Sequence, residues 1–159
     1  MTTSALGKVH VFASDFKERS DLDAGCYANM VRVGKLAESD KTATVFVAGS
    51  ALVADSKIEI ITALSGAGDR KWSLEIATDG RPHVDSASLA PGKPWLAVAM
   101  RGGQVHVIDA EQGAKIATVN AQGPIPEIGW ARIKGSENPL LLVATGASLN
   151  AFRVAASSK

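Results

Sequence analysis

The chain has 159 residues, of which 46% are hydrophobic and 21% are charged. This composition is typical of a folded domain and excludes a disordered chain except at the ends. The chain has seventeen Lys and Arg residues and sixteen Asp and Glu residues, so its charges nearly balance. The basic residues are scattered along the sequence, which argues against nucleic acid as a partner. The single cysteine, Cys26, forms neither an internal disulfide nor a cysteine metal site.

The first residues carry no targeting signal that we recognise. Residues 1–7 lack a basic stretch followed by an apolar stretch, and the longest apolar runs are much shorter than a membrane span. Together with the lone cysteine, this predicts a protein of the cytoplasm that does not bind membranes.

The first element expected is a strand at Lys8–Ala13, which resembles the third strand of the later units and has no first or second strand ahead of it. The best helical candidate, residues 15–22, is short and charged. Glu18, Asp21 and Asp23 form a charged cluster near the N-terminus, with no nearby His or Cys to complete a calcium loop or a nucleophile, so they indicate a solvated connection.

Three further units follow, each built from short runs of alternating or β-branched residues between Gly and Pro turns. The expected strands of the second unit are 29–33, 44–48, 57–62 and 71–76. Those of the third unit are 83–89, 95–100, 104–108 and 114–119. The last unit has strands at 127–131, 140–144 and 149–154 and stops before a fourth.

One strand-like phrase occurs four times, about every 45 to 50 residues, which indicates one supersecondary unit per copy. The copies are Lys8–Ala13, Lys57–Thr62, Gln104–Asp109 and Ser148–Arg153. An immunoglobulin-like sandwich would also contain short strands at regular spacing, but it gives no reason for a repeated phrase. The sequence therefore predicts an all-β propeller.

Residues 103–119 resemble the third strand, turn and fourth strand of a WD40 repeat. At the positions of the family's Trp-Asp pair the chain has Phe12-Ala13, Ile61-Thr62, Ile108-Asp109 and Phe152-Arg153. The Gly-His pair is absent, with residues 80–83 the nearest match, and Trp72 is similar to the tryptophan of quinoprotein propeller repeats, the near alternative. The resemblance implies a partial β-propeller of about three four-stranded antiparallel blades whose interfaces rely on apolar packing.

In this reading the chain is a single domain. Its parts are a partial first unit, two blades and an incomplete blade, at residues 1–26, 27–78, 79–120 and 121–159. About twelve or thirteen strands leave sheet faces and edges open, so we expect no stable free monomer. A homodimer, in which the N-terminal segment of each copy completes the last blade of the other, and a heteromeric complex both satisfy this expectation.

The candidate chemical residues favour structural roles. His10 and His106 occupy equivalent strand positions on different blades, so a shared metal site is not expected. Cys26 is expected to be a small buried side chain and the tryptophans to fill gaps between blades. The predicted first strands carry a set of polar residues that is too thin for a catalytic site: Asn29, Asp85, Ser86 and Glu127. We expect no cofactor and no metal.

Recognition is expected in loops. The connections from a fourth strand to the next first strand, and from a second to a third strand, share one face in the family that the chain resembles. On that face we predict a partner-binding set, with arginines favoured as interface hot spots: Arg81, His83, Arg101 and Gln122. The function expected is a non-enzymatic scaffold or subunit that binds protein partners through loops and open blade edges. The alternative is a propeller-class enzyme, quinoprotein-like or hydrolytic, with an axial site.

Overall fold

The computed structural model describes residues 2–3, 7–12, 18–37, 39–121 and 123–155. These residues form fourteen strands and no helix, so the fold class is all-β. Within this described part, no helix is long and apolar enough to cross a membrane.

The first sheet contains three strands in the order β1 (Thr2–Thr3), β2 (Lys8–Phe12) and β3 (Glu18–Asp23). Two expectations for this region are wrong. A strand does precede Lys8, since Thr3 of β1 pairs with Val9. The acidic segment is a strand rather than a connection, because its backbone pairs antiparallel with β2 and Leu22 lies opposite Val9.

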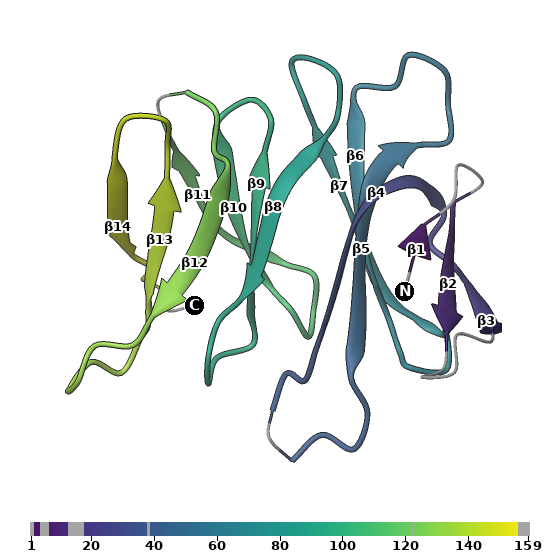
Figure 1. Cartoon of the computed structure of the whole chain (residues 1–159), viewed down its shortest axis with the longest axis horizontal. Helices are drawn as coiled ribbons and strands as arrows, with labels where there is room; N and C mark the ends of the chain where they lie inside the picture. Colours follow the sequence, from purple (N-terminus) through teal and green to yellow (C-terminus); the bar gives the residue numbers. More distant parts are fainter. Residues whose placement is uncertain (1, 4–6, 13–17, 38, 122, 156–159) are drawn as a thin grey trace. The chain divides into compact units, whose positions relative to one another are not determined.

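The other eleven strands form three antiparallel meanders (Figure 1). The second sheet contains β4 (Cys26–Gly34), β5 (Thr44–Ala51), β6 (Ile58–Leu64) and β7 (Arg70–Ala77). The third contains β8 (Val84–Leu89), β9 (Trp95–Met100), β10 (Gln104–Asp109) and β11 (Lys115–Asn120). The fourth contains β12 (Glu127–Ala131), β13 (Leu140–Ala144) and β14 (Leu149–Arg153), the three-stranded piece that the sequence predicts.

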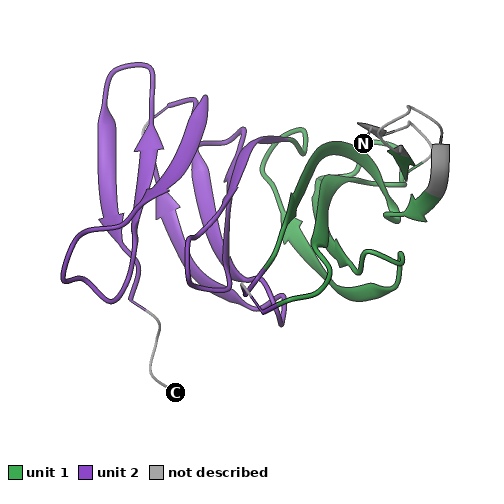
Figure 2. Cartoon of the chain, turned by 60° about the horizontal axis from the view of Figure 1, so that its bottom comes forward, with its two compact units in different colours: residues 1–35, 40–83 green, residues 36–39, 84–159 purple. Residues whose placement is uncertain are grey.

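The strands separate into two compact units (Figure 2). Unit 1 comprises residues 1–35 and 40–83, and unit 2 comprises residues 36–39 and 84–159. The core of unit 1 joins the first two sheets through buried residues such as Val9, Leu22, Val47 and Leu64.

The core of unit 2 joins the third and fourth sheets. Val105 and Val107 of β10 and Leu141 of β13 are fully buried in it. The rings of Trp95 and Trp130 lie 6.0 Å apart at the edge of this core, which places both tryptophans between two sheets as expected.

The hairpins that close the second and third sheets share one design. Ser65 Oγ accepts hydrogen bonds from the backbone N–H groups of Ala67 and Asp69, at 3.2 and 3.1 Å. In the third sheet, Asp109 Oδ1 accepts two bonds from the next turn, both at 2.9 Å. The glycine that follows in each turn has positive φ, 98° at Gly68 and 74° at Gly113.

This equivalence corrects the alignment of the second repeat. The register between the third and fourth strands shifts after Val11, Ala63 and Val107 in the first three sheets. Ala63 and Val107 each lie two residues before the residue that begins the turn, Ser65 or Asp109. Because Ser65 and Asp109 also begin equivalent turns, Leu64-Ser65 is the counterpart of Ile108-Asp109, and the prediction of Ile61-Thr62 is wrong. The bulge and the turn, rather than the run of isoleucines, fix the register.

Candidate protein-binding groove of unit 1

Two connections meet at one end of the second sheet. The first is the link from β5 to β6, residues 52–57, and the second is the link from β7 to β8, residues 78–83. The backbone N–H of Thr78 donates to the Lys57 carbonyl at 2.8 Å, and the Thr78 hydroxyl donates to the Lys57 and Gly80 carbonyls at 2.9 and 2.8 Å. These bonds hold the two connections side by side.

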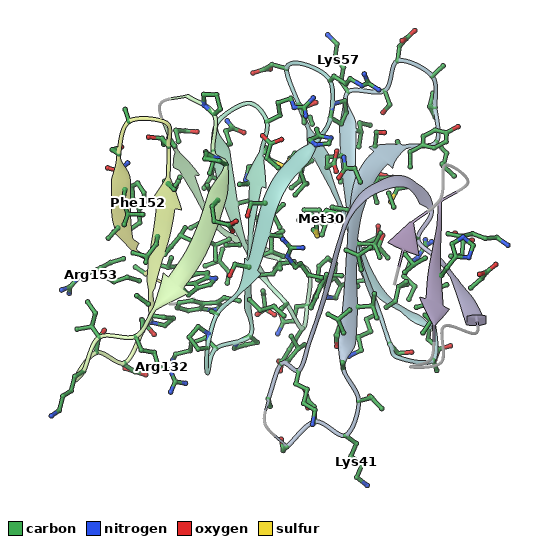
Figure 3. All side chains as sticks on the ribbon, viewed as in Figure 1. Met30, Lys41, Lys57, Arg132, Phe152 and Arg153 are labelled. Carbon is green, nitrogen blue, oxygen red and sulfur yellow. The ribbon has the colours of Figure 1, made fainter. Side chains whose placement is uncertain are left out.

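Between the connections lies a groove of about 600 Å³, which is within the range of small ligand sites. It is lined by Tyr27, Ser50, Ala51, Val53, Ala54, Asp55, Ser56, Lys57, Gly80, Arg81 and Pro82. Figure 3 shows Lys57 at this end of the sheet. We call this surface the loop groove.

The loop groove combines positive charge with exposed apolar surface. Lys57 and Arg81 are exposed and form no ion pair with the described residues, whereas Asp55 is the one acidic side chain in the lining. Tyr27 and Val53 are 46% and 69% exposed. An unpaired arginine next to an accessible tyrosine has the composition of an interface hot spot.

The β5–β6 connection adopts a backbone conformation that needs support. Asp55 has a φ of 55°, the one positive φ of a non-glycine residue in the part of the chain described. The Ser56 hydroxyl accepts a bond from the Ile58 N–H at 3.1 Å, and the Ser56 N–H donates to the Val53 carbonyl at 3.2 Å. Val53 is thereby held at the groove in a fixed turn.

Next to the groove lies a buried carboxylate. Glu59 pairs directly with Ser50, which in turn pairs with Tyr27, so two of the three residues in this cross-strand row line the groove. The Glu59 side chain is fully buried and neither of its carboxylate oxygens forms a hydrogen bond. Burial raises the pKa of Glu59 to about 7, and the nearby Asn29 amide opposes that rise.

The predicted binding residues that the structure describes belong to two different units. Arg81 lines the loop groove, and His83 Nδ1 lies 3.1 Å from the Asn29 amide nitrogen in the same unit. Arg101 belongs to unit 2, in the β9–β10 turn, where its Nε lies 3.6 Å from Asp85 Oδ1. Gln122 lies outside the described residues.

Among the residues that sequence reasoning missed are the two exposed apolar side chains and the second cation of the groove: Tyr27, Val53 and Lys57. A signal for Val53 was present, because an apolar run from Ala51 to Ala54 is unusual in a connection between strands. Nothing in the sequence marked Tyr27, whose exposure depends on its place at the end of β4.

The remaining chemically capable side chains have structural surroundings. Burial, followed by the charge of Glu59, raises the pKa of the Cys26 thiol to about 12, so this cysteine is not a reactive thiolate. Ser86 Oγ donates to Glu127 Oε1 at 3.0 Å, which ties two of the candidate first-strand residues to each other. No cluster of three metal-ligating side chains occurs among the residues described.

No family model and no curated protein matches the chain. Solved structures do match it. One is the BBS1N chain in complex with ARL6DN, with a TM-score of 0.64 and 17% identity over 94% of this chain and 45% of that one. Another is Hsv2 of Kluyvelomyces marxianus, with a TM-score of 0.61 and 18% identity over 87% of this chain and 43% of that one.

Both proteins are β-propellers, and the likeness shows that this chain has the propeller fold. The identities are too low to show more than the fold. The chain spans less than half the length of either structure.

Proposed function

We propose that the chain is a non-enzymatic interaction module of the WD40 type, which works in the cytoplasm as a subunit of a larger assembly. Its loop groove binds a protein partner. One observation carries the proposal: the same groove contains two cations without an ion-pair partner among the described residues, Lys57 and Arg81, and two exposed apolar side chains, Tyr27 and Val53.

The charge and shape of the groove define the chemistry of its partner. Two cationic groups against the single Asp55 carboxylate favour an acidic side chain, which an arginine binds through two parallel hydrogen bonds. Tyr27, Val53 and Pro82 offer an apolar wall beside these cations. A peptide segment with an acidic residue next to an aliphatic or aromatic residue fits both parts.

A protein partner is in keeping with the structure of BBS1N, which was solved in complex with ARL6DN. The chain covers less than half of either propeller, so the rest of any closed ring lies outside these 159 residues. This supports a role as one part of a larger assembly.

The test is purification of the tagged chain from its native source, followed by mass determination and quantitative identification of bound proteins. The variant Lys57→Glu with Arg81→Glu is compared with a control, Lys41→Glu with Arg132→Glu, which makes the same charge change at two exposed residues outside the groove. We expect the first variant to lose at least one wild-type partner that the control keeps. Equal retention by both variants, or a wild-type protein recovered as a free 16.5 kDa monomer, would refute the proposal.

A further inference from the structure

One amide in unit 1 lies between two ionisable side chains. The Asn29 amide nitrogen lies 3.1 Å from His83 Nδ1, and the same amide is close enough to the Glu59 carboxyl to oppose the rise that burial causes in its pKa. Glu59 belongs to β6, whereas His83 ends the connection from β7 to β8, so Asn29 joins that strand to that connection. We call these three side chains the polar relay.

A β-bulge holds Asn29 in this position. The pairing between β4 and β5 shifts between Ala28 and Met30, so Asn29 is the extra residue of the bulged strand. The two strands approach closely here, because a methyl group on Gly49 of β5 would collide with the Tyr27 carbonyl. The bulge therefore depends on a glycine and sets the direction of the Asn29 side chain.

The Glu59 carboxyl has few ways to satisfy its oxygens. It is fully buried, and neither oxygen forms a hydrogen bond with the described residues. A protonated carboxyl donates through its O–H to the Asn29 amide oxygen, which leaves the amide N–H groups for His83 Nδ1. An ionised carboxyl only accepts, so the amide must turn its nitrogen toward Glu59 and its oxygen toward His83. The polar relay thus has two arrangements, which differ in the orientation of one amide.

Both ends of the polar relay adjoin the loop groove. Glu59 lies directly opposite Ser50, a residue of the groove lining, and the Cβ atoms of such opposing residues are about 5 Å apart. His83 follows Arg81 and Pro82, which also line the groove. A change in the charge of Glu59 or in the orientation of Asn29 therefore acts on residues of the groove.

The net charge of the groove is small, so one further charge has a large relative effect. Lys57 and Arg81 are positive and Asp55 is negative, which leaves one net positive charge in the lining. An ionised Glu59 would cancel this charge, whereas a protonated Glu59 leaves it in place. Because burial raises the pKa of Glu59 to about 7, this carboxyl changes charge near neutral pH.

We propose that the polar relay makes the loop groove responsive to protons, so that the groove attracts an acidic partner more strongly when Glu59 is protonated than when it is ionised. A bound anion favours the protonated carboxyl, and by reciprocity the affinity for the anion falls as the pH rises through the range in which Glu59 ionises. The inference rests on the proposed function, because it concerns regulation of the same groove.

Other ionisable groups surround the polar relay. Cys26 keeps its proton near neutral pH, because burial, followed by the charge of Glu59, raises its pKa to about 12. A histidine can change its charge near neutral pH, so His83 needs a variant of its own. The ionisable groups are Cys26 and Tyr27 from β4, Asp55 and Lys57 from the β5–β6 connection, and Asp79, Arg81 and His83 from the β7–β8 connection, whereas β5 and β7 place Ser50 and Ile76 opposite Glu59.

The first measurement follows the polar relay by NMR and needs no partner. The side-chain amide signals of Asn29 are recorded in the full chain as the pH is raised from 6 to 8. We expect them to shift with a midpoint at about pH 7, in the wild type and in His83→Gln but not in Glu59→Gln, which cannot ionise. Glu75→Gln, at an exposed position on β7, is the matched control and should keep the shift.

The second measurement reports the charge of the groove. Small nitroxides that carry a carboxylate or an ammonium group broaden the amide signals of the residues they approach, so the ratio of their effects reports the local charge. At Val53 and Gly80, which line the groove, we expect the excess of the anionic probe to fall by about half from pH 6 to pH 8. The fall should persist in His83→Gln and disappear in Glu59→Gln.

Asn29→Ala is a second variant, at an exposed bulge position where folding should be kept. Because the Asn29 amide lowers the pKa of Glu59, its removal should move the fall in the probe ratio to higher pH. An unchanged midpoint in Asn29→Ala, or a groove charge that still falls in Glu59→Gln, would overturn the proposal. Neither measurement requires a partner, so a failure of the proposed function, seen as the absence of a partner that depends on the groove, is distinguishable from a failure of the polar relay.

Discussion

The buried carboxylate of Glu59 predicts a specific dependence of stability on pH. Its pKa rises from 4.5 to about 7 in the folded chain, so the folded state keeps a proton that the unfolded state releases above pH 4.5. The Glu59 contribution to the free energy of unfolding is therefore fully present below pH 4.5 and is lost as the pH rises to about 7. The difference of about 2.5 in pKa corresponds to about 3 kcal/mol.

The assay is urea unfolding of the wild type and of Glu59→Gln at pH 5 and pH 8. The glutamine cannot ionise, so we expect the variant to gain about 2 to 3 kcal/mol relative to the wild type between these two pH values. Any constant penalty from the buried amide cancels in this comparison, and so does the titration of His106, whose pKa is lowered first by burial and then by Lys115. Glu75→Gln, at an exposed position on β7, is the control.

Equal pH profiles for the wild type and Glu59→Gln would refute the reasoning. They would mean that the carboxylate reaches water or finds a hydrogen-bond partner in solution, so that its charge costs no more in the folded than in the unfolded chain.

Three further substitutions test the packing. Ile108→Asp places a charge at a fully buried site and should abolish soluble expression, whereas a soluble variant would show that β10 is misplaced. Arg101→Ala removes a partly exposed ion pair at 3.6 Å and should change the free energy of unfolding by about 0.5 kcal/mol or less while weakening any partner bound at this turn; a larger loss in urea unfolding would contradict that placement. Gly49→Ala should destabilise strongly, because its methyl group would collide with the Tyr27 carbonyl of the neighbouring strand, and a wild-type melting temperature would disprove this close approach.

Where strands are bounded by Gly or Pro, the sequence predicted them well. The ends of β9, β12 and β13 agree with the predicted ranges 95–100, 127–131 and 140–144. Each of these segments contains buried apolar residues, and turn residues leave little freedom in where it starts or stops.

Two of the three errors in the fold have a common physical origin. The run from Ile58 to Ile61 shows no clean alternation, so the sequence alone could not fix which isoleucine faces which sheet. In β3, the charged side chains hid a strand whose existence depends on pairing with β2, a contact between residues far apart in sequence. Both features become visible only through cross-strand register.

The candidate site was predicted in part, through Arg81 and the rule that certain connections share a face. Loop length explains why the groove itself was not foreseen. In the third sheet the β9–β10 connection is short, residues 101–103, and Gly103 accepts a direct backbone bond from Ala121, which begins the next connection. In the second sheet the corresponding link, residues 52–57, is twice as long, and Val53 and Lys57 of this link line the groove. A repeat pattern describes what the sheets have in common. The loop groove arises instead from a connection that is longer in one sheet than in another, which a periodic signal does not reveal.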